Sequence, residues 1–312
     1  MKTNVTSKIA EEAIRIRLSQ IFINEDYKAG KFKVPIHLSF GHEAIAVAVS
    51  NVLKEEDKLV LTHRNMAYNL VRAQRLKPIL DEYYMKETGL AGGKLGSMNL
   101  INPKKNIIYS SSILGNNFPV SVGIAMSEKI RNENGVIFVL GGDGSIEEGS
   151  FYESLVMMKS MGVRVVVIIE NNEWSLGTHI SERRAPIELG KLTDSIDIPY
   201  VRLEGNNIDE YIKKLEDLRE RTFITNQPVC VEVILKTLGD KRHPPTPEFP
   251  GGKYINYHAG PTTAVDIEKH FPGGIINESA DDPIFVLSQK LGKENFTKIS
   301  NDVFNELKNE LV

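Results

Sequence analysis

The sequence predicts an α/β fold: a doubly wound parallel sheet with helical flanks. Apolar runs at 136–140, 163–169 and 229–235, with a shorter one at 200–203, lack polar alternation, which is typical of parallel strands covered on both faces. Segments with helical spacing separate most of these runs, as a doubly wound sheet requires. Of the 312 residues, 41% are hydrophobic, so the chain can bury a sizeable core.

The N-terminal third is expected to be mostly helical. Helices are predicted over 43–53 and 66–86, and a glycine-rich loop follows at 89–100. The first helix is predicted over 7–24, where apolar residues recur at helical spacing: Ile9, Ala13, Ile16, Leu18 and Ile21.

Through the middle of the chain, the predicted strands are joined by helices over 149–161 and 208–222. Residues 236–261 are rich in proline, glycine and cations and predict a long ordered loop. Two helices, over 282–291 and 297–310, are expected near the end of the chain. We expect a single domain over 1–312 with a C-terminal helical tail at 264–312.

The composition limits the classes of partner. The net charge is −3, so no basic excess points to a nucleic acid or a membrane surface. The charged N-terminal segment has no apolar signal core, and no apolar run approaches the length of a membrane span. The single cysteine, Cys230, excludes an intrachain disulfide and is expected in the core. We therefore expect a cytoplasmic protein.

Oxygen-bearing side chains follow two of the predicted strands. The run 136–140 ends at Gly-Gly-Asp143-Gly144-Ser145, and the run 163–169 ends at Glu-Asn-Asn172. Carboxyl ends of neighbouring parallel strands meet at one edge of a sheet, where ligands bind. A carboxylate and an amide oxygen suit Mg²⁺, and a helix beginning near Gly149 favours an anion such as a diphosphate. An ordinary strand-to-helix turn beside an unrelated Asn-Asn turn is the alternative.

With these motifs in place, the chain resembles the thiamine-diphosphate enzymes, and most of all the alpha subunits of 2-oxo acid dehydrogenases. Further segments carry the resemblance: FGHEAIAV, LTHRNMAYNL, GGKLGSMNL, SILGNNFPVSVGIA, ENNEWSLGT and DDPIFVLSQKLGKENF. The resemblance implies thiamine diphosphate and Mg²⁺ as cofactors. It implies metal ligands at Asp143, Asn172 and the Trp174 carbonyl. It also implies cofactor contacts from Arg64, from backbone at Gly144 and Ser145, and from backbone at Ser112 and Leu114.

The chain departs from that family at several histidines. The family has tyrosine where His63 stands and histidine where Met66, Asn99 and Ser111 stand. Its His-Gly-His-Ser loop is absent, and residues 232–261 instead resemble a transketolase.

The chain has three candidate catalytic residues, of which His258 and Glu148 stand in transketolase-like segments and His63 stands beside Arg64. His258 is a candidate for diphosphate or substrate contact, His63 for cofactor or substrate contact, and Glu148 for a relay role. Each has an alternative interpretation. His258 can be a surface loop histidine, His63 a partly buried polar residue, and Glu148 part of a solvated helix start. His37 and His42 have no metal-ligand spacing and are expected to be structural, although His42 can line the site.

The resemblance also implies partners. The glutamate that activates thiamine diphosphate lies on a second, pyrimidine-binding domain in these enzymes, so a separate beta subunit and an α2β2 assembly are expected. The leading hypothesis is decarboxylation of a 2-oxo acid with acyl transfer to a lipoyl acyltransferase. The alternative hypothesis is half of a split transketolase-like enzyme that moves a two-carbon unit between ketose sugars. A non-catalytic, cofactor-binding scaffold is a third possibility.

Overall fold

The computed structural model describes residues 2–239 and 241–311. One six-stranded sheet in the order β2-β1-β3-β4-β8-β7 forms its centre, and every strand pair in it is parallel. This confirms the predicted doubly wound parallel sheet. The strands are β1 (Lys58–Thr62), β2 (Ile107–Ser111), β3 (Ile137–Gly142), β4 (Val165–Asn171), β7 (Tyr200–Leu203) and β8 (Val229–Ile234).

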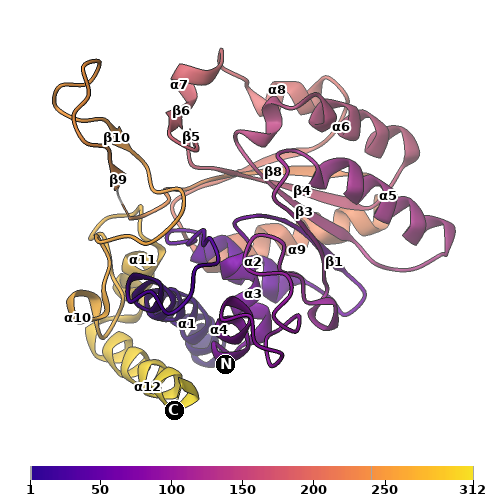
Figure 1. The fold of residues 1–312 in the computed structure, drawn as a ribbon. Coiled ribbons are helices and arrows are strands. Elements are labelled where there is room, and N and C mark those ends of the chain that lie inside the picture. Colours follow the sequence, from indigo (N-terminus) through magenta and orange to yellow (C-terminus); the bar gives the residue numbers. More distant parts are fainter. Residues whose placement is uncertain (1, 240, 312) are drawn as a thin grey trace.

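Helices cover both faces of this sheet (Figure 1). One face is covered by α1 (Lys2–Lys28), α2 (Glu43–Val52), α3 (Met66–Ala73) and α9 (Ile208–Thr225). The opposite face is covered by α5 (Asn117–Ile130), α6 (Gly149–Met161) and α8 (Leu189–Asp194).

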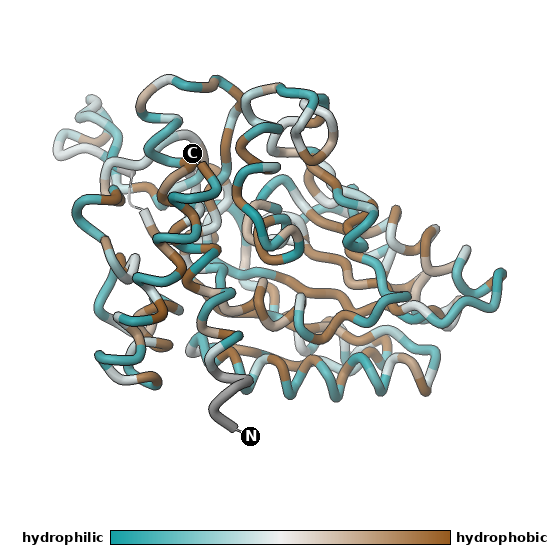
Figure 2. The backbone as a smooth tube through the Cα atoms, turned by 90° about the horizontal axis from the view of Figure 1, so that it is seen from below, coloured by the Kyte–Doolittle hydropathy of each residue, from teal (hydrophilic) through white to brown (hydrophobic). Residues whose placement is uncertain are grey.

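Strand β3 shows why its sequence has no polar alternation. Phe138 and Leu140 pack into the cluster on the α1 and α2 side, whereas Ile137 and Val139 pack into the cluster on the α5 and α6 side. All four are fully buried. Figure 2 shows the resulting hydrophobic colouring along the central strands. Cys230 is buried in the second cluster, as predicted.

The remaining elements lie at the periphery. Helices α11 and α12 pack against the N-terminal half of the molecule (Figure 1). The short elements are α4 (Lys77–Tyr83), η1 (Pro103–Lys105), η2 (Ser145–Glu147), β5 (Trp174–Ser175), β6 (Thr178–His179), α7 (Ile180–Arg183), β9 (Lys241–Arg242), β10 (Tyr254–Ile255) and α10 (Ile267–His270), and the C-terminal helices are α11 (Pro283–Leu291) and α12 (Lys293–Leu311).

Several predicted elements need correction. The helix expected over 66–86 is two helices, because Gln74 takes a left-handed conformation (φ 55°) and Pro78 begins a new helix. Strands β1 and β2 and helix α5 were not predicted. The segment 236–261 is mostly loop, as expected, with β9 and β10 forming a two-stranded ribbon. Among the helices of the described residues, none is long and apolar enough to cross a membrane.

Candidate functional site

The candidate site lies where the direction of strand addition reverses. From β1 the chain adds β2 on one side and then returns to add β3 and β4 on the other. Ligands of doubly wound sheets bind at this switch point, beyond the carboxyl ends of the strands. A pocket lies there, lined by Thr62 at the end of β1, Ser111 at the end of β2, Asp143 after β3 and Asn172 after β4.

Most of the predicted site residues line this pocket. The group comes from five separate segments of the chain, and each member was selected from the sequence: His63, Arg64, Leu114, Asp143, Gly144, Ser145, Asn172, Trp174 and His258.

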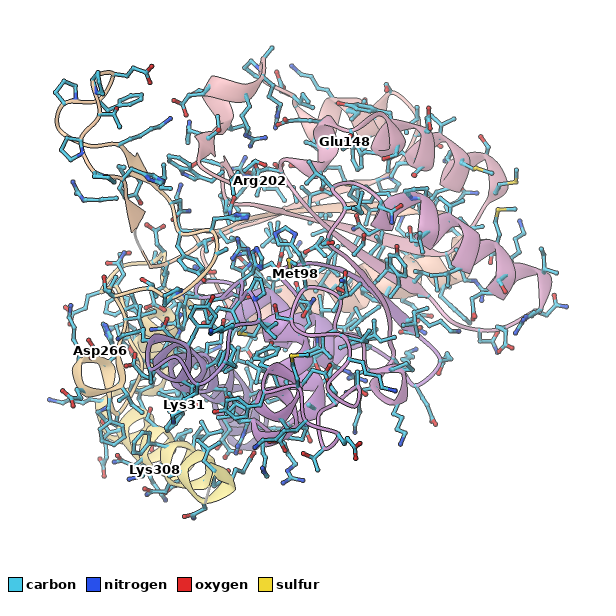
Figure 3. All side chains as sticks on the ribbon, viewed as in Figure 1. Lys31, Met98, Glu148, Arg202, Asp266 and Lys308 are labelled. Atoms are coloured by element: carbon cyan, nitrogen blue, oxygen red, sulfur yellow. The ribbon has the colours of Figure 1, made fainter. Side chains whose placement is uncertain are left out.

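Two selected residues are not in the lining. Ser112 is exposed, and its neighbour Ser111 lines the pocket instead. Glu148 is exposed at the start of α6 (Figure 3), where its side chain packs against Gly115 of the pocket wall. Within this chain Glu148 therefore reaches the pocket only indirectly.

Asp143 is a buried carboxylate beside a cation. It is 1% exposed and forms an ion pair with the Arg183 guanidinium, which also pairs with Glu147. The carboxylate accepts a backbone hydrogen bond from Asn172, so the two predicted metal ligands are adjacent. Burial raises the pKa of Asp143 above its usual value, although Arg183 opposes this effect. A carboxylate held this way needs a positive partner to stay ionised.

Hydrogen bonds fix the amide of Asn172. Its Nδ2 donates to Thr237 Oγ1 at 2.7 Å, which leaves Oδ1 as the acceptor that receives the Trp174 backbone N–H at 3.0 Å. Thr237 Oγ1 also lies 3.0 Å from His42 Nε2, and His42 Nδ1 lies 3.3 Å from the Glu170 carboxylate. This buried chain sets which Asn172 atom is an acceptor.

Arg64 is 8% exposed and is anchored by two backbone carbonyls. It donates to Leu38 at 2.6 Å and to His258 at 3.1 Å. Burial lowers the pKa of the guanidinium, and Tyr257 and Glu170 oppose this; it remains charged at neutral pH. The planar group has five N–H donors, more than these two carbonyls use, so Arg64 supplies positive charge to the pocket wall.

His63 and His258 meet in space, and His37 joins them. His63 and His258 line the pocket, with ring centroids 5.7 Å apart. Burial, followed by the charge on Arg64, lowers the pKa of His37 to about 2 and that of His63 to about 3, so both rings are neutral at pH 7. His37 was expected to be structural, and nothing in its sequence spacing indicates this cluster.

Three further residues were missed by sequence reasoning. Arg183 was not selected because an exposed-looking Glu-Arg-Arg run carries no spacing signal. Tyr68 of α3 donates to Glu170 of β4 at 2.7 Å, and the two are 102 positions apart, so no local pattern pairs them. Thr237 had the strongest available signal, because it stands in the transketolase-like Lys-Thr-x-Gly segment.

Comparison with known proteins places this geometry in a family. Residues 12–236 match the family described as "Dehydrogenase E1 component". The chain belongs to the dehydrogenase E1 component family. The match includes β1, β3 and β4 with the residues that follow them, and it ends one residue before Thr237. The E1 family match favours the leading hypothesis of the sequence analysis over a split transketolase.

Individual proteins similar to this chain are named as E1 subunits. The chain is 31% identical over 207 residues to the pyruvate dehydrogenase E1 component subunit alpha of Rickettsia bellii, and equally to that of Rickettsia prowazekii. These matches cover 66% of this chain and 64% of each relative. The mitochondrial subunit alpha of Saccharomyces cerevisiae is 31% identical over 198 residues, covering 64% of this chain and 46% of the relative. The chain therefore spans less than two thirds of the length of these relatives.

Proposed function

We propose that this chain is the alpha-type subunit of a thiamine-diphosphate- and Mg²⁺-dependent 2-oxo acid dehydrogenase that acts with a separate beta subunit. One observation carries the proposal: the pocket at the sheet's switch point gathers the Asp143 carboxylate, the Asn172 amide and the Arg64 guanidinium. Family membership supports the same reaction class, because the relatives are named pyruvate dehydrogenase E1 alpha subunits.

The donor set fits a metal-bound diphosphate. Asp143 and the Oδ1 of Asn172 are the hard oxygen ligands that Mg²⁺ prefers, and Asp143 already holds a cation, the Arg183 guanidinium. The Trp174 carbonyl is proposed as a third ligand. Gly144 and Ser145 would offer backbone contacts to the diphosphate, and Arg64 would pair with it. The 112–114 segment would meet the aminopyrimidine ring.

When bound, thiamine diphosphate supplies a carbanion that adds to a carbonyl and stores the electrons released by decarboxylation. The residues of this chain would hold and shield that reaction. His63 and His258 have ring nitrogens that can donate or accept a proton at the pocket wall, and the catalytic assignment to them is part of the proposal. Glu148, which is exposed here, would join a relay only from an interface with a partner.

Exposed apolar residues at the pocket support a beta subunit. Ile113, Leu114 and Leu176 line the pocket and are 68%, 45% and 66% exposed. Large apolar side chains gathered at the mouth of a site mark a surface that a partner covers. We propose that the beta subunit closes the pocket in an α2β2 assembly and supplies the glutamate that activates the cofactor. The acyl acceptor is proposed to be a lipoyl acyltransferase, and the location cytoplasmic.

Calorimetric titration of thiamine diphosphate in the presence of Mg²⁺ tests the site. We expect saturable binding by the wild-type chain. Asp143→Asn should weaken it at least about tenfold, since even residues that only support metal ligands cost this much. Asp302→Asn, an exposed acid on α12, is the control and should bind as the wild type does. Equal binding by all three proteins would remove the assignment of Asp143.

Reconstitution tests the reaction. The chain alone should turn over no substrate, and the chain mixed with its beta subunit should decarboxylate a 2-oxo acid. Pyruvate, branched 2-oxo acids and ketose phosphates should be compared in one assay. Turnover of ketose phosphates alone would overturn the proposal, and turnover of none by a pair that binds the cofactor would favour a scaffold.

A further inference from the structure

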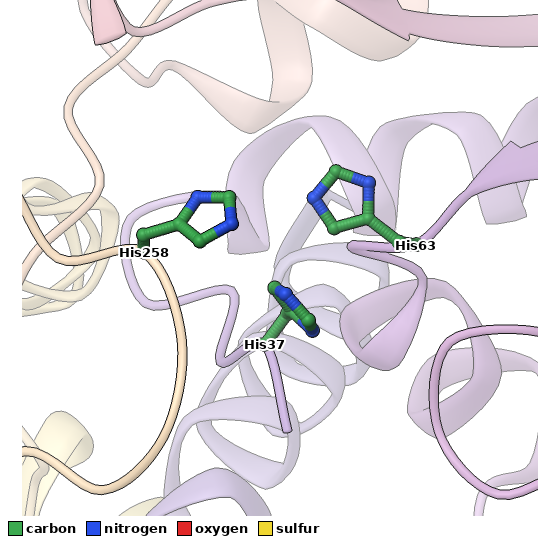
Figure 4. Close-up of side chains that lie close together, drawn as sticks. All are labelled: His37, His63 and His258. Carbon is green, nitrogen blue, oxygen red and sulfur yellow. The ribbon is translucent and has the colours of Figure 1, made fainter. Parts of the chain in front are cut away.

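Three histidines from distant parts of the chain meet beside the pocket. His37 lies between α1 and α2, His63 follows β1, and His258 follows β10. Figure 4 shows the rings of His63 and His258 on opposite sides with His37 between and below them. The ring centroid of His37 lies 4.7 Å from that of His63 and 5.1 Å from that of His258. One ring nitrogen from each residue lies within 4.8 Å of the other two.

We propose that His37, His63 and His258 form a binding site for a divalent first-row transition-metal ion of the Zn²⁺ class. Three imidazole nitrogens with an open fourth position for water are a common zinc arrangement. Zinc–nitrogen bonds of about 2.0–2.1 Å require ring nitrogens roughly 3.3 Å apart in a tetrahedral site. Small side-chain rotations close the observed separation, because His63 and His258 are only partly buried.

His37 is the buried member of the cluster, whereas His63 and His258 are partly buried. His37 Nδ1 is buried and has no hydrogen-bond partner among the described residues. Metal coordination through that nitrogen would satisfy it.

The charge of Arg64 limits how tightly the histidine cluster is expected to bind a metal ion. Arg64 follows His63 in the chain and donates to the His258 carbonyl at 3.1 Å, so its charge lies beside the cluster. The same charge repels a dication, so binding should be weaker than at a structural zinc site. Glu170 acts electrostatically on Arg64 and reduces this repulsion.

The cluster differs from the oxygen site at Asp143 in the metal it selects. Imidazole favours Zn²⁺, Co²⁺, Ni²⁺ and Cu²⁺, whereas carboxylate and amide oxygens favour Mg²⁺. Because His63 and His258 also line the pocket, an ion bound to them would compete with the proposed cofactor or substrate. The metal site itself does not depend on the proposed function, whereas its inhibitory effect rests on that function.

Co²⁺ titration of the cofactor-free protein tests the site, with Mg²⁺ in excess to occupy oxygen ligands. We expect one equivalent of Co²⁺ to give the strong visible absorption of a low-coordinate cobalt–imidazole site, and Zn²⁺ to abolish it. His37→Asn and His258→Asn should each weaken Co²⁺ binding at least about tenfold. His243→Asn, an exposed histidine of the same long loop, is the matched control and should leave the spectrum unchanged.

Thermal unfolding of each variant separates loss of the site from loss of the fold. The inference would be overturned if the wild type gave no Co²⁺ spectrum. It would also be overturned if folded His37→Asn and His258→Asn kept that spectrum. Thiamine diphosphate binding is measured separately with Mg²⁺ alone. A chain that binds Co²⁺ at the histidines but no cofactor contradicts only the proposed function, and the reverse result contradicts only the metal site.

Discussion

At the scale of single residues, Arg183 holds the position beside Asp143 that a metal ion is proposed to take. Its guanidinium is largely buried and pairs with Asp143 and Glu147. Among the described residues, the next residue, Arg184, pairs only with Glu147, at 2.9 Å. Removing one partner of a buried ion pair is costly because the other charge is left without compensation.

Arg183→Met should therefore destabilise the metal-free protein by about 3 kcal/mol. Mg²⁺ can replace the lost positive charge at Asp143, so added Mg²⁺ should raise the melting temperature of Arg183→Met more than that of the wild type. Differential scanning fluorimetry with and without Mg²⁺ measures both effects. Arg184→Met should behave as the wild type does toward Mg²⁺; an equal response from Arg183→Met would argue against Asp143 as a metal ligand.

Thr237 is the second residue whose role can be isolated. It joins Asn172 to His42 through one hydroxyl, and it is 3% exposed. Thr237→Val keeps the shape and removes the hydroxyl. It leaves the amide of Asn172 and a nitrogen of His42 without their partner, at a cost of about 1–3 kcal/mol.

We expect urea unfolding to show that loss for Thr237→Val, together with weaker binding of thiamine diphosphate, because the Asn172 amide is no longer held in one orientation. Thr237→Ser restores the hydroxyl and should recover most of both quantities. A Thr237→Ser variant no better than Thr237→Val would mean that packing by the methyl group, and not the hydrogen bonds, matters at this position.

At the scale of elements, the C-terminal helices are tied to the N-terminal one through a buried ion pair. Arg17 of α1 donates to both carboxylate oxygens of Asp282, at 2.9 and 3.1 Å, and to Glu43 of α2 at 2.6 Å. Asp282 also caps α11 by accepting the Ile284 N–H at 2.9 Å. One carboxylate thus starts a helix and docks it.

Asp282→Asn should lower the free energy of unfolding by about 3–5 kcal/mol at pH 7. Burial acts to raise the pKa of Asp282, but Arg17 and backbone N–H donors hold it below its usual value. A depressed carboxyl pKa stabilises the fold above the unfolded value, about 3.9, and this stabilisation is lost as the pH falls through the folded value.

Urea unfolding at a series of pH values between 3 and 7 measures this effect. The wild type should lose stability on the acid side more steeply than Asp282→Asn does. The exposed neighbour Asp281 provides the control, since Asp281→Asn should change stability by no more than about 0.5 kcal/mol and keep the wild-type slope. Parallel acid-side slopes for the wild type and Asp282→Asn would contradict the assigned role.

The elements also show what the sequence could predict. Strands β3, β4 and β8 were found because their sequences are mostly apolar, and most of their residues are buried. Strand β2 was missed because this edge strand, Ile107–Ser111, is only partly apolar, and β1 because a five-residue run follows charged residues. Helix α5 contains Pro119 and Gly123, which disfavour a helix locally. Packing of α5 against β3 and α6 overrides that local preference.

Part of the candidate site could also be predicted from the sequence. Asp143 and Asn172 could be paired from sequence because parallel strand ends lie together by rule. His37 could not, since its approach to His258 depends on how a loop beyond the sheet folds back, and no periodicity encodes that. Arg183 could not either, because the position of α7 is set by tertiary contacts with Asp143 and Glu147.

At the scale of the whole molecule, the outer face of α6 carries exposed apolar side chains. Val156, Met157 and Met161 of α6 are 51%, 43% and 42% exposed, whereas Met158 between them is buried. The structure thus divides the methionines of this helix between a core position and an exposed face. Glu148, at the start of the same helix, is exposed as well. An exposed apolar face on the helix that follows Asp143 is a natural place for another subunit to pack.

Met157→Lys tests whether this face is used. The charge should change the stability of the isolated chain by no more than about 0.5 kcal/mol, because the side chain is already exposed. In a subunit interface it would bury an unpaired charge, so assembly should be lost or weakened at least about tenfold. Light scattering of the chain alone and mixed with its beta subunit measures the mass of each assembly. Ile224→Lys, at an exposed apolar position on α9, is the control and should assemble normally. An unchanged assembly mass for Met157→Lys, across a dilution series, would place the subunit contact on another face and leave Glu148 without a partner-dependent role.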